Sequence, residues 1–110
     1  MSGEVFNTAL NEFINGAQAK IDAYYNAQFP RQGSVLKIEG GRKYIKISKT
    51  STFDGVENEM GKSVYCFINK ENGDVLKAAS WKAPAKHARG NIYNEDNGLN
   101  AVSAYGANYL

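Results

Sequence analysis

The stretch SVYCFINKENGDVLKAASW, residues 63–81, decides the fold of this chain. Its first half is apolar at odd and even positions alike, which indicates a central strand over Lys62–Asn69 that is covered on both faces. Glu71-Asn72-Gly73 is typical of a three-residue hairpin loop that ends in a glycine with left-handed backbone. Asp74–Trp81 is therefore expected to return as the antiparallel neighbour of the first strand.

This loop predicts a register, and the register sorts the side chains. Ile68 would face Leu76 on an aliphatic face, and Phe67 would face Lys77 on the opposite, outer face. Because side chains alternate along a strand, a slip of one residue would exchange the two faces. The outer face is expected to carry aromatic and basic side chains: Tyr44, Lys46, Tyr65, Phe67, Lys77 and Trp81.

The chain before this hairpin predicts one helix and two further strands. Residues 3–26 form an amphipathic helical pattern, in which apolar side chains recur at spacings of three and four. Alternation predicts strands at Ser34–Glu39 and Arg42–Thr50, joined by a turn at Gly40-Gly41, and the polar segment Ser51–Gly61 predicts a loop. The apolar stripe of the helix comprises Phe6, Leu10, Phe13, Ala17, Ile21 and Tyr24.

Regular patterning weakens after Ala83-Pro84. Residues 91–110 are rich in Asn, Ala, Gly and Tyr, and we expect an irregular segment there. The predicted fold class is therefore α+β: an N-terminal amphipathic helix packed on a three- to four-stranded antiparallel sheet, with an irregular C-terminal segment. This segment is expected to fold back onto the sheet through Ile92, Tyr93, Leu99, Val102, Tyr105 and Tyr109.

Length and composition predict one domain over residues 1–110, since compact domains cluster near roughly 100–150 residues. Cys66 is the only cysteine, so no intrachain disulfide can form, and we expect a buried thiol in a reducing compartment. We expect no signal peptide, because the sequence does not start with a basic leader followed by an apolar stretch. We expect no membrane span, because no apolar run approaches the ~20 residues that a bilayer requires. The predicted location is the cytoplasm.

Catalytic and metal-binding patterns are not found in the sequence. His87 is the only histidine, and one His with one Cys cannot complete a closed zinc site. Asp54, Glu57 and Glu59 do not match the spacing of a calcium loop. We therefore expect a protein that is not an enzyme, with no cofactor and no metal.

Charge is segregated along the chain into two basic and three acidic blocks. Residues 31–49 carry six Lys and Arg against one Glu, and residues 77–89 carry four and no acid. Clustered Lys and Arg attract phosphate backbones, and unpaired bases stack on exposed aromatic rings. We therefore expect binding of single-stranded nucleic acid. The candidate binding residues are Tyr44, Lys46, Lys77, Trp81, Lys82, Lys86 and Arg89.

A structural role for the aromatic residues is the competing interpretation. Tyr65, Phe67 and Trp81 could form a second core layer that the tyrosine-rich C-terminal segment covers. In that case the outer face would not be free to bind a partner. The sequence leaves both interpretations open.

The segment SVYCFINKENGDVLKAASWKAPAKHARGNIY, residues 63–93, resembles a family of small uncharacterised proteins of tailed bacteriophages. The resemblance implies a phage-encoded protein that acts in the cytoplasm of a bacterial host. It brings no activity, fold or site residues with it. It favours two roles: handling of nucleic acid, or binding and inhibition of a host enzyme or a defence complex as an anti-defence protein.

Overall fold

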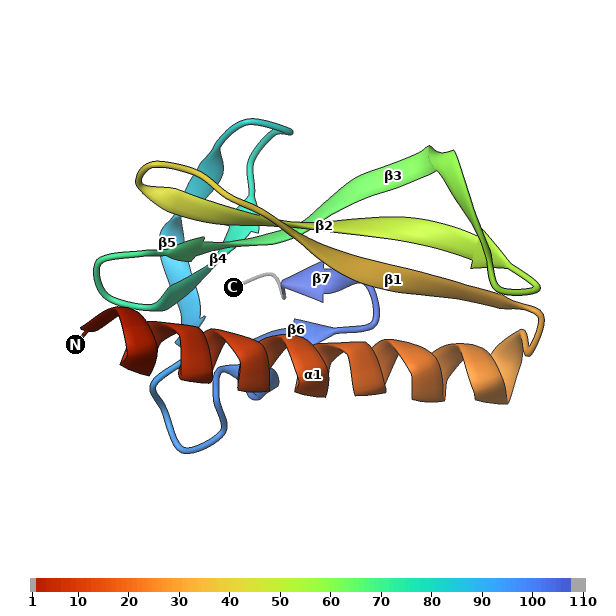
Figure 1. The fold of residues 1–110 in the computed structure, drawn as a ribbon, viewed down its shortest axis with the longest axis horizontal. Coiled ribbons are helices and arrows are strands. Elements are labelled where there is room, and N and C mark those ends of the chain that lie inside the picture. The colour runs from red at the N-terminus through yellow and green to blue at the C-terminus, as the bar shows by residue number, and fades with distance from the viewer. Residues whose placement is uncertain (1, 108–110) are drawn as a thin grey trace.

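The computed structural model describes residues 2–107, in which one long helix, α1 (Ser2–Gln28), packs on a five-stranded antiparallel sheet (Figure 1). The strand order is β1-β2-β3-β4-β5. The α+β class predicted from the sequence is confirmed, although the sheet has more strands than expected. Their bounds are β1 (Gln32–Glu39), β2 (Tyr44–Phe53), β3 (Val56–Asn69), β4 (Asp74–Ala78) and β5 (Pro84–Asn91).

The prediction of a loop at Ser51–Gly61 is wrong, because β2 and β3 continue through this segment as a long hairpin. Asp54 and Gly55 form its turn with φ of 52° and 82°, and Phe53 pairs with Val56 on either side. Two successive positive φ values are the mark of a type I′ turn, for which Asp-Gly is a favoured sequence. The polar composition of the segment concealed this turn signal.

The loop between β3 and β4 has four residues, 70–73, and not three. Asn69 starts the turn one residue early, because its side-chain oxygen accepts a hydrogen bond from the Glu71 amide at 2.8 Å. Gly73 does adopt the expected left-handed backbone, with φ of 81°. The extra loop residue shifts the pairing of the two strands by one.

This shift corrects the predicted faces of β4. Phe67 pairs with Leu76, and Ile68 pairs with Val75. Leu76 therefore lies on the outer face, and alternation places Lys77 on the inner face, which is the face toward α1. Both residues had been predicted on the opposite faces.

Tyr65 also lies on the inner face, contrary to the prediction. The β2–β3 register slips between the pairs Ile47–Cys66 and Ser48–Val64, so that Tyr65 is the extra residue of a β-bulge. Its buried ring belongs to the main core, and its hydroxyl donates to the Ser103 carbonyl oxygen at 2.6 Å. A bulge of this kind leaves no periodicity signal in the sequence.

The strand β4 ends at Ala78, so Trp81 lies in the connection to β5 and not in a strand as predicted. The strand β5 was not expected, because its sequence has no apolar alternation. It is an edge strand that begins with Pro84, a position where a missing amide donor is tolerated.

The C-terminal segment folds back between α1 and the inner face of the sheet (Figure 1). It contains a 3₁₀ turn, Leu99–Ala101, and a two-stranded ribbon of β6 (Val102–Ser103) and β7 (Gly106–Ala107). Ile92 and Val102 are buried as expected, whereas Tyr93 and Tyr105 are exposed, and Tyr109 lies outside the described residues. Gly16 makes room for this segment, because a Cβ atom there would lie 2.4 Å from Leu99 Cδ1.

The main core joins α1, the inner face and the C-terminal segment. The predicted packing of Leu10, Phe13 and Ile21 on the sheet is confirmed. The helix also covers the free edge of β1, where the Gln18 amide donates to the Ser34 carbonyl oxygen and accepts from the Leu36 amide. The inner-face residues of this core include Ile45, Ile47, Cys66, Ile68 and Val75.

Candidate functional site

Trp81 is the centre of the candidate site, and its side chain extends over the outer face. Lys46 Nζ lies 4.0 Å from the centroid of the Trp81 ring, and Lys62 Nζ lies 5.7 Å from it. Trp81 is 43% exposed, so part of its ring is free to meet a ligand. We call Trp81, Lys46 and Lys62 the Trp81 site.

A tight turn holds Trp81 in place. Ser80 Oγ accepts hydrogen bonds from the amides of Lys82 and Ala83, at 3.3 and 3.2 Å. The Ala83 carbonyl oxygen in turn accepts from the amides of Ala79 and Ser80. Six backbone and side-chain groups on either side of Trp81 are thereby fixed without any regular secondary structure.

The floor beneath this site is apolar. Phe67 pairs with Lys46 in the β2–β3 ladder and is only 3% exposed, and its neighbour Leu76 is buried as well. The Tyr44 ring meets Phe67 edge-on, with 6.5 Å between centroids. Phe67 thus belongs to a second apolar layer on this face, as the competing interpretation expects. The described part of the C-terminal segment, however, packs on the inner face and does not cover this layer.

The electrostatic balance of the Trp81 site includes one carboxylate. Glu39 pairs with Lys46 in the β1–β2 ladder, and its carboxylate forms an ion pair of 2.9 Å with Lys62. Lys62, followed by Ser48, holds the pKa of Glu39 below its ordinary value. Glu39 is therefore ionised at neutral pH and offsets part of the charge of the two lysines.

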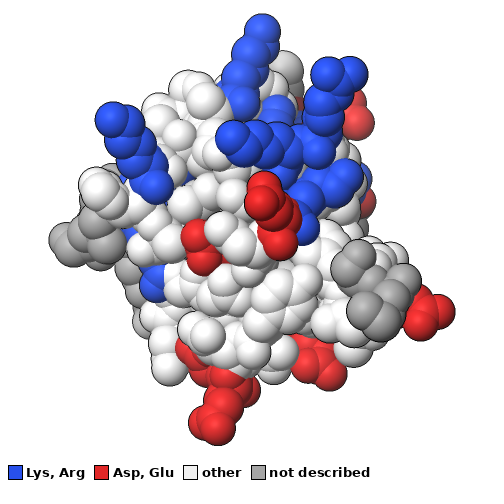
Figure 2. All heavy atoms as spheres, turned by 90° about the vertical axis from the view of Figure 1, so that its left-hand side faces the viewer, with Lys and Arg blue, Asp and Glu red and all other residues white. Residues whose placement is uncertain are grey.

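The two basic blocks of the sequence meet in space, because Lys46 belongs to the first and Trp81 to the second. Figure 2 shows the end of the molecule that lies at the left of Figure 1. Lys and Arg gather over the upper part of this end, on the side of the sheet. Asp and Glu dominate its lower margin, on the side of the helix. The β3–β4 loop joins the first block here, since Lys70 Nζ donates to the Gly41 carbonyl oxygen at 3.2 Å.

Of the residues predicted to bind, the structure brings Lys46 and Trp81 into contact, and it places Tyr44 on the same outer face, against Phe67. Lys82 is exposed directly beside Trp81. Lys86 is exposed on β5, within the stretch where the β4–β5 register shifts between the pairs Leu76–Ala88 and Ala78–Pro84.

Two of the predicted residues are less well placed. Arg89 is half-buried beside a register shift of β5, and its guanidinium donates to the His87 carbonyl oxygen. Alternation along β4 puts Lys77 on the inner face, away from the Trp81 site.

The sequence did not reveal the contribution of Lys62. This residue comes from an acidic block, and only the long β2–β3 hairpin brings it to Trp81. Its phase in the predicted strand gave no signal, because the bulge at Tyr65 changes the face on which Lys62 lies.

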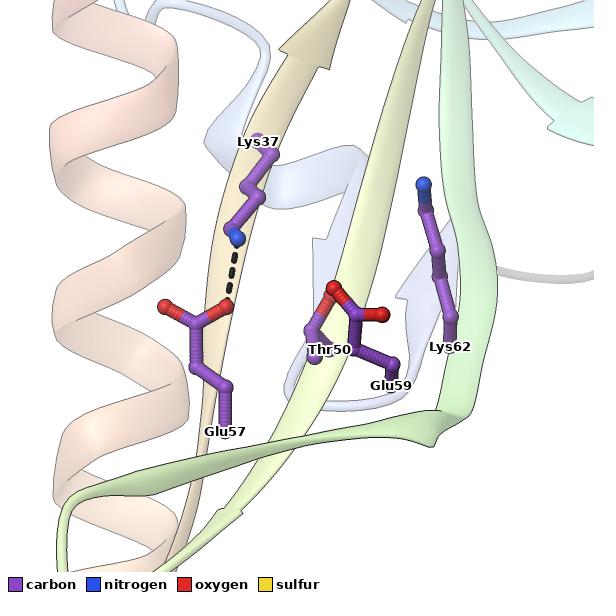
Figure 3. A pocket seen from close by; sticks show the side chains of 5 residues that line it. All are labelled: Lys37, Thr50, Glu57, Glu59 and Lys62. Carbon is purple, nitrogen blue, oxygen red and sulfur yellow. Dashed lines mark hydrogen bonds and ion pairs between the residues drawn. The ribbon is translucent and has the colours of Figure 1, made fainter.

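A cavity adjoins the Trp81 site on the outer face, and Lys62 belongs to both. It has a volume of about 170 Å³ and is lined by Lys37, Thr50, Glu57, Glu59 and Lys62. Figure 3 shows Glu59 beside Thr50, between the Lys37–Glu57 ion pair and Lys62. The sequence had placed both glutamates in a loop, which is why no cavity was expected.

Within residues 2–107, no three His, Cys, Asp or Glu side chains are grouped so that they could hold a metal ion. No helix in that range combines the length and the apolarity that crossing a membrane requires.

The fold and the outer face define a small α+β protein with an aromatic and basic sheet surface. The chain belongs to a family described as "Family of unknown function (DUF7717)", whose model matches residues 4–108. No curated protein shows significant similarity to this chain. No solved structure does so either.

Proposed function

We propose that this protein is a non-catalytic nucleic-acid-binding accessory protein that prefers single strands and binds them on the outer face. The observation that carries this proposal is the contact of Lys46 and Lys62 with the exposed Trp81 ring. Stacking surfaces and phosphate-neutralising groups side by side are what single-strand binders combine. The resemblance to tailed-phage proteins supports a phage-encoded protein in the cytoplasm of a bacterial host.

The free energies of the contacts involved favour binding of a strand. A bound strand would replace the Lys46–Trp81 cation–π contact and the Lys62–Glu39 ion pair. An exposed cation–π contact contributes about 0.5–1 kcal/mol, and an exposed ion pair contributes at most about 1 kcal/mol. A base stacked on an aromatic ring contributes about 1–3 kcal/mol. A strand can therefore draw Lys46 from the ring to a phosphate while a base takes its place on Trp81.

A salt titration of binding to single-stranded DNA and RNA tests this proposal. Log affinity should fall linearly with log salt, and Lys86→Ala should make the slope shallower by about 0.7, the value for one phosphate contact on a single strand. Trp81→Ala should weaken binding by about 1–3 kcal/mol with little change of slope, because stacking displaces few ions. Arg31→Ala, at the opposite end of the sheet, is the matched control and should leave the slope unchanged. Absence of binding at about 50 mM salt by the folded protein would reject the proposal.

A second candidate function is supported by the far end of the β2–β3 hairpin. Phe53 and Val56 flank its turn and are 52% and 70% exposed. Phe53 also lines an apolar groove with Phe29 and Pro30. Exposed apolar surface of this kind is typical of protein-binding sites. It supports the alternative that the protein binds and inhibits a host enzyme or defence complex.

Recovery of a tagged copy from infected cells separates the two candidates. Mixed partners that are lost on nuclease treatment would support nucleic-acid binding. One stoichiometric partner that resists nuclease, and that is lost in Phe53→Ser, would support the inhibitor.

A further inference from the structure

The cavity beside the Trp81 site contains a matched set of charges. Two lysines and two glutamates line it, together with the buried Thr50. A lining of balanced charge suits neither a free anion nor a free cation. It suits a neutral molecule that carries hydrogen-bond donors on one edge and acceptors on another.

Glu59 is the side chain with spare bonding capacity. Glu57 is engaged with Lys37, and Lys62 is engaged with Glu39. Within residues 2–107, the Glu59 carboxylate forms no hydrogen bond or ion pair, and among the lining side chains it lies between the Lys37–Glu57 ion pair and Lys62 (Figure 3). Its two oxygens can accept two parallel N–H groups from a ligand.

The volume and position of the cavity restrict the ligand further. Pockets for drug-sized ligands have roughly 300–1,000 Å³, so that about 170 Å³ suits a single small heterocycle. Lys62 lines the cavity and also lies 5.7 Å from the Trp81 ring centroid. A base in the cavity and a base on Trp81 can therefore belong to neighbouring nucleotides of one strand.

We propose that this cavity receives a guanine base, and that Glu59 selects it. Guanine is the base with two adjacent donors, N1–H and the N2 amino group, which match one carboxylate. Its O6 and N7 acceptors match an ammonium group, which Lys62 supplies. Adenine and cytosine offer a donor next to an acceptor, and uracil and thymine offer one donor between two acceptors. The inference rests on the function proposed above and adds a base preference to it.

Short thymidine strands that carry one central guanine, hypoxanthine or adenine test the inference. Hypoxanthine lacks only the N2 amino group of guanine. The guanine strand should bind about tenfold more tightly than the hypoxanthine strand, as expected for loss of one arm of a bidentate base contact. Glu59→Gln should reduce this ratio to below about twofold while the all-thymidine strand binds at least as well as before. Glu12→Gln, an exposed change of the same charge on α1, should keep the full ratio.

Each other outcome overturns the inference in a recognisable way. Salt-dependent binding with equal affinity for guanine and hypoxanthine strands would refute the guanine site and leave the proposed function standing. A guanine preference that survives in Glu59→Gln would refute the role of Glu59. Absence of binding to every strand would refute the inference and the proposed function together.

Discussion

At the scale of single residues, Glu39 competes with any incoming phosphate for Lys62. Their ion pair is 2.9 Å long, and the lowered pKa of Glu39 keeps its carboxylate charged at neutral pH. Both partners are partly exposed, so the pair itself contributes little to stability. Its effect on a bound polyanion is larger, because Glu39 repels phosphate and neutralises a lysine at the same position.

Glu39→Gln should therefore strengthen binding of single strands, by up to about fivefold at low salt. On an all-thymidine strand, which puts no guanine against Lys62, the salt dependence should become steeper by about 0.7, because Lys62 is released for a phosphate. Filter binding over a range of salt concentrations measures both changes. The same substitution at Glu12, far from the Trp81 site, serves as the control. Weaker binding by the Glu39 variant would mean that this carboxylate positions Lys62 for the strand.

At the same scale, the reactivity of the Cys66 thiol tests whether β3 is buried in the core. The residue is completely buried on β3, and burial raises the pKa of its thiol well above the ordinary value. The reactive thiolate is therefore scarce and shielded from solvent. A water-soluble thiol reagent should label the folded protein far more slowly than the protein in denaturant. Rapid labelling of the folded protein would contradict the placement of β3.

At the scale of elements, the β2–β3 hairpin builds the cavity and brings Lys62 to Trp81. Its turn depends on Gly55, which has φ of 82° and open space where a Cβ would be. Gly40 also has open space but no positive φ, so the two glycines differ in backbone conformation and not in crowding.

Gly55→Ala should consequently destabilise the protein by about 1 kcal/mol, the lower limit for an alanine in the left-handed region. Gly40→Ala should change the free energy of unfolding by less than about 0.5 kcal/mol, as exposed substitutions usually do. Urea denaturation of the two variants measures this contrast. Equal effects at both glycines would show that the turn does not have the described backbone.

The elements that follow from the sequence are those with a clear apolar pattern. The helix over residues 3–26 and the strand around Ile45 and Ile47 were predicted because one of their faces is buried in the core. The strand around Cys66 was predicted because it is apolar at successive positions. The edge strand β5 was missed because it buries little apolar surface. The register of β4 was missed because one side-chain hydrogen bond, from Glu71 to Asn69, lengthens the loop.

At the scale of the whole molecule, the sheet separates two kinds of surface. The end with the Trp81 site is rich in Lys and Arg (Figure 2), whereas the tip of the β2–β3 hairpin exposes Phe53 and Val56. The C-terminal segment completes the inner core and leaves the outer face uncovered by its described part. The two proposed functions would therefore use opposite ends of the sheet: the Trp81 end for nucleic acid, or the hairpin tip for a protein partner.

The sequence predicts only those residues of the candidate site whose type alone, aromatic or basic, marks them as binding residues. Tyr44, Lys46 and Trp81 were found because clustered aromatic and basic residues are visible in the sequence itself. Lys62 and the cavity residues could not be found, because they come together only through the irregular pairing of β2 and β3. Long-range register of this kind depends on bulges that periodicity does not reveal.

The fluorescence of Trp81, the only tryptophan, tests the central claim most directly. A base that stacks on the indole should change its emission in a saturable manner as a single-stranded oligonucleotide is added, and added salt should reverse the change. Duplex DNA of the same length should have a much weaker effect, because its bases are already stacked. Binding that is detected by an independent method but leaves the Trp81 emission unchanged would contradict the account, since the strand would then lie elsewhere on the molecule.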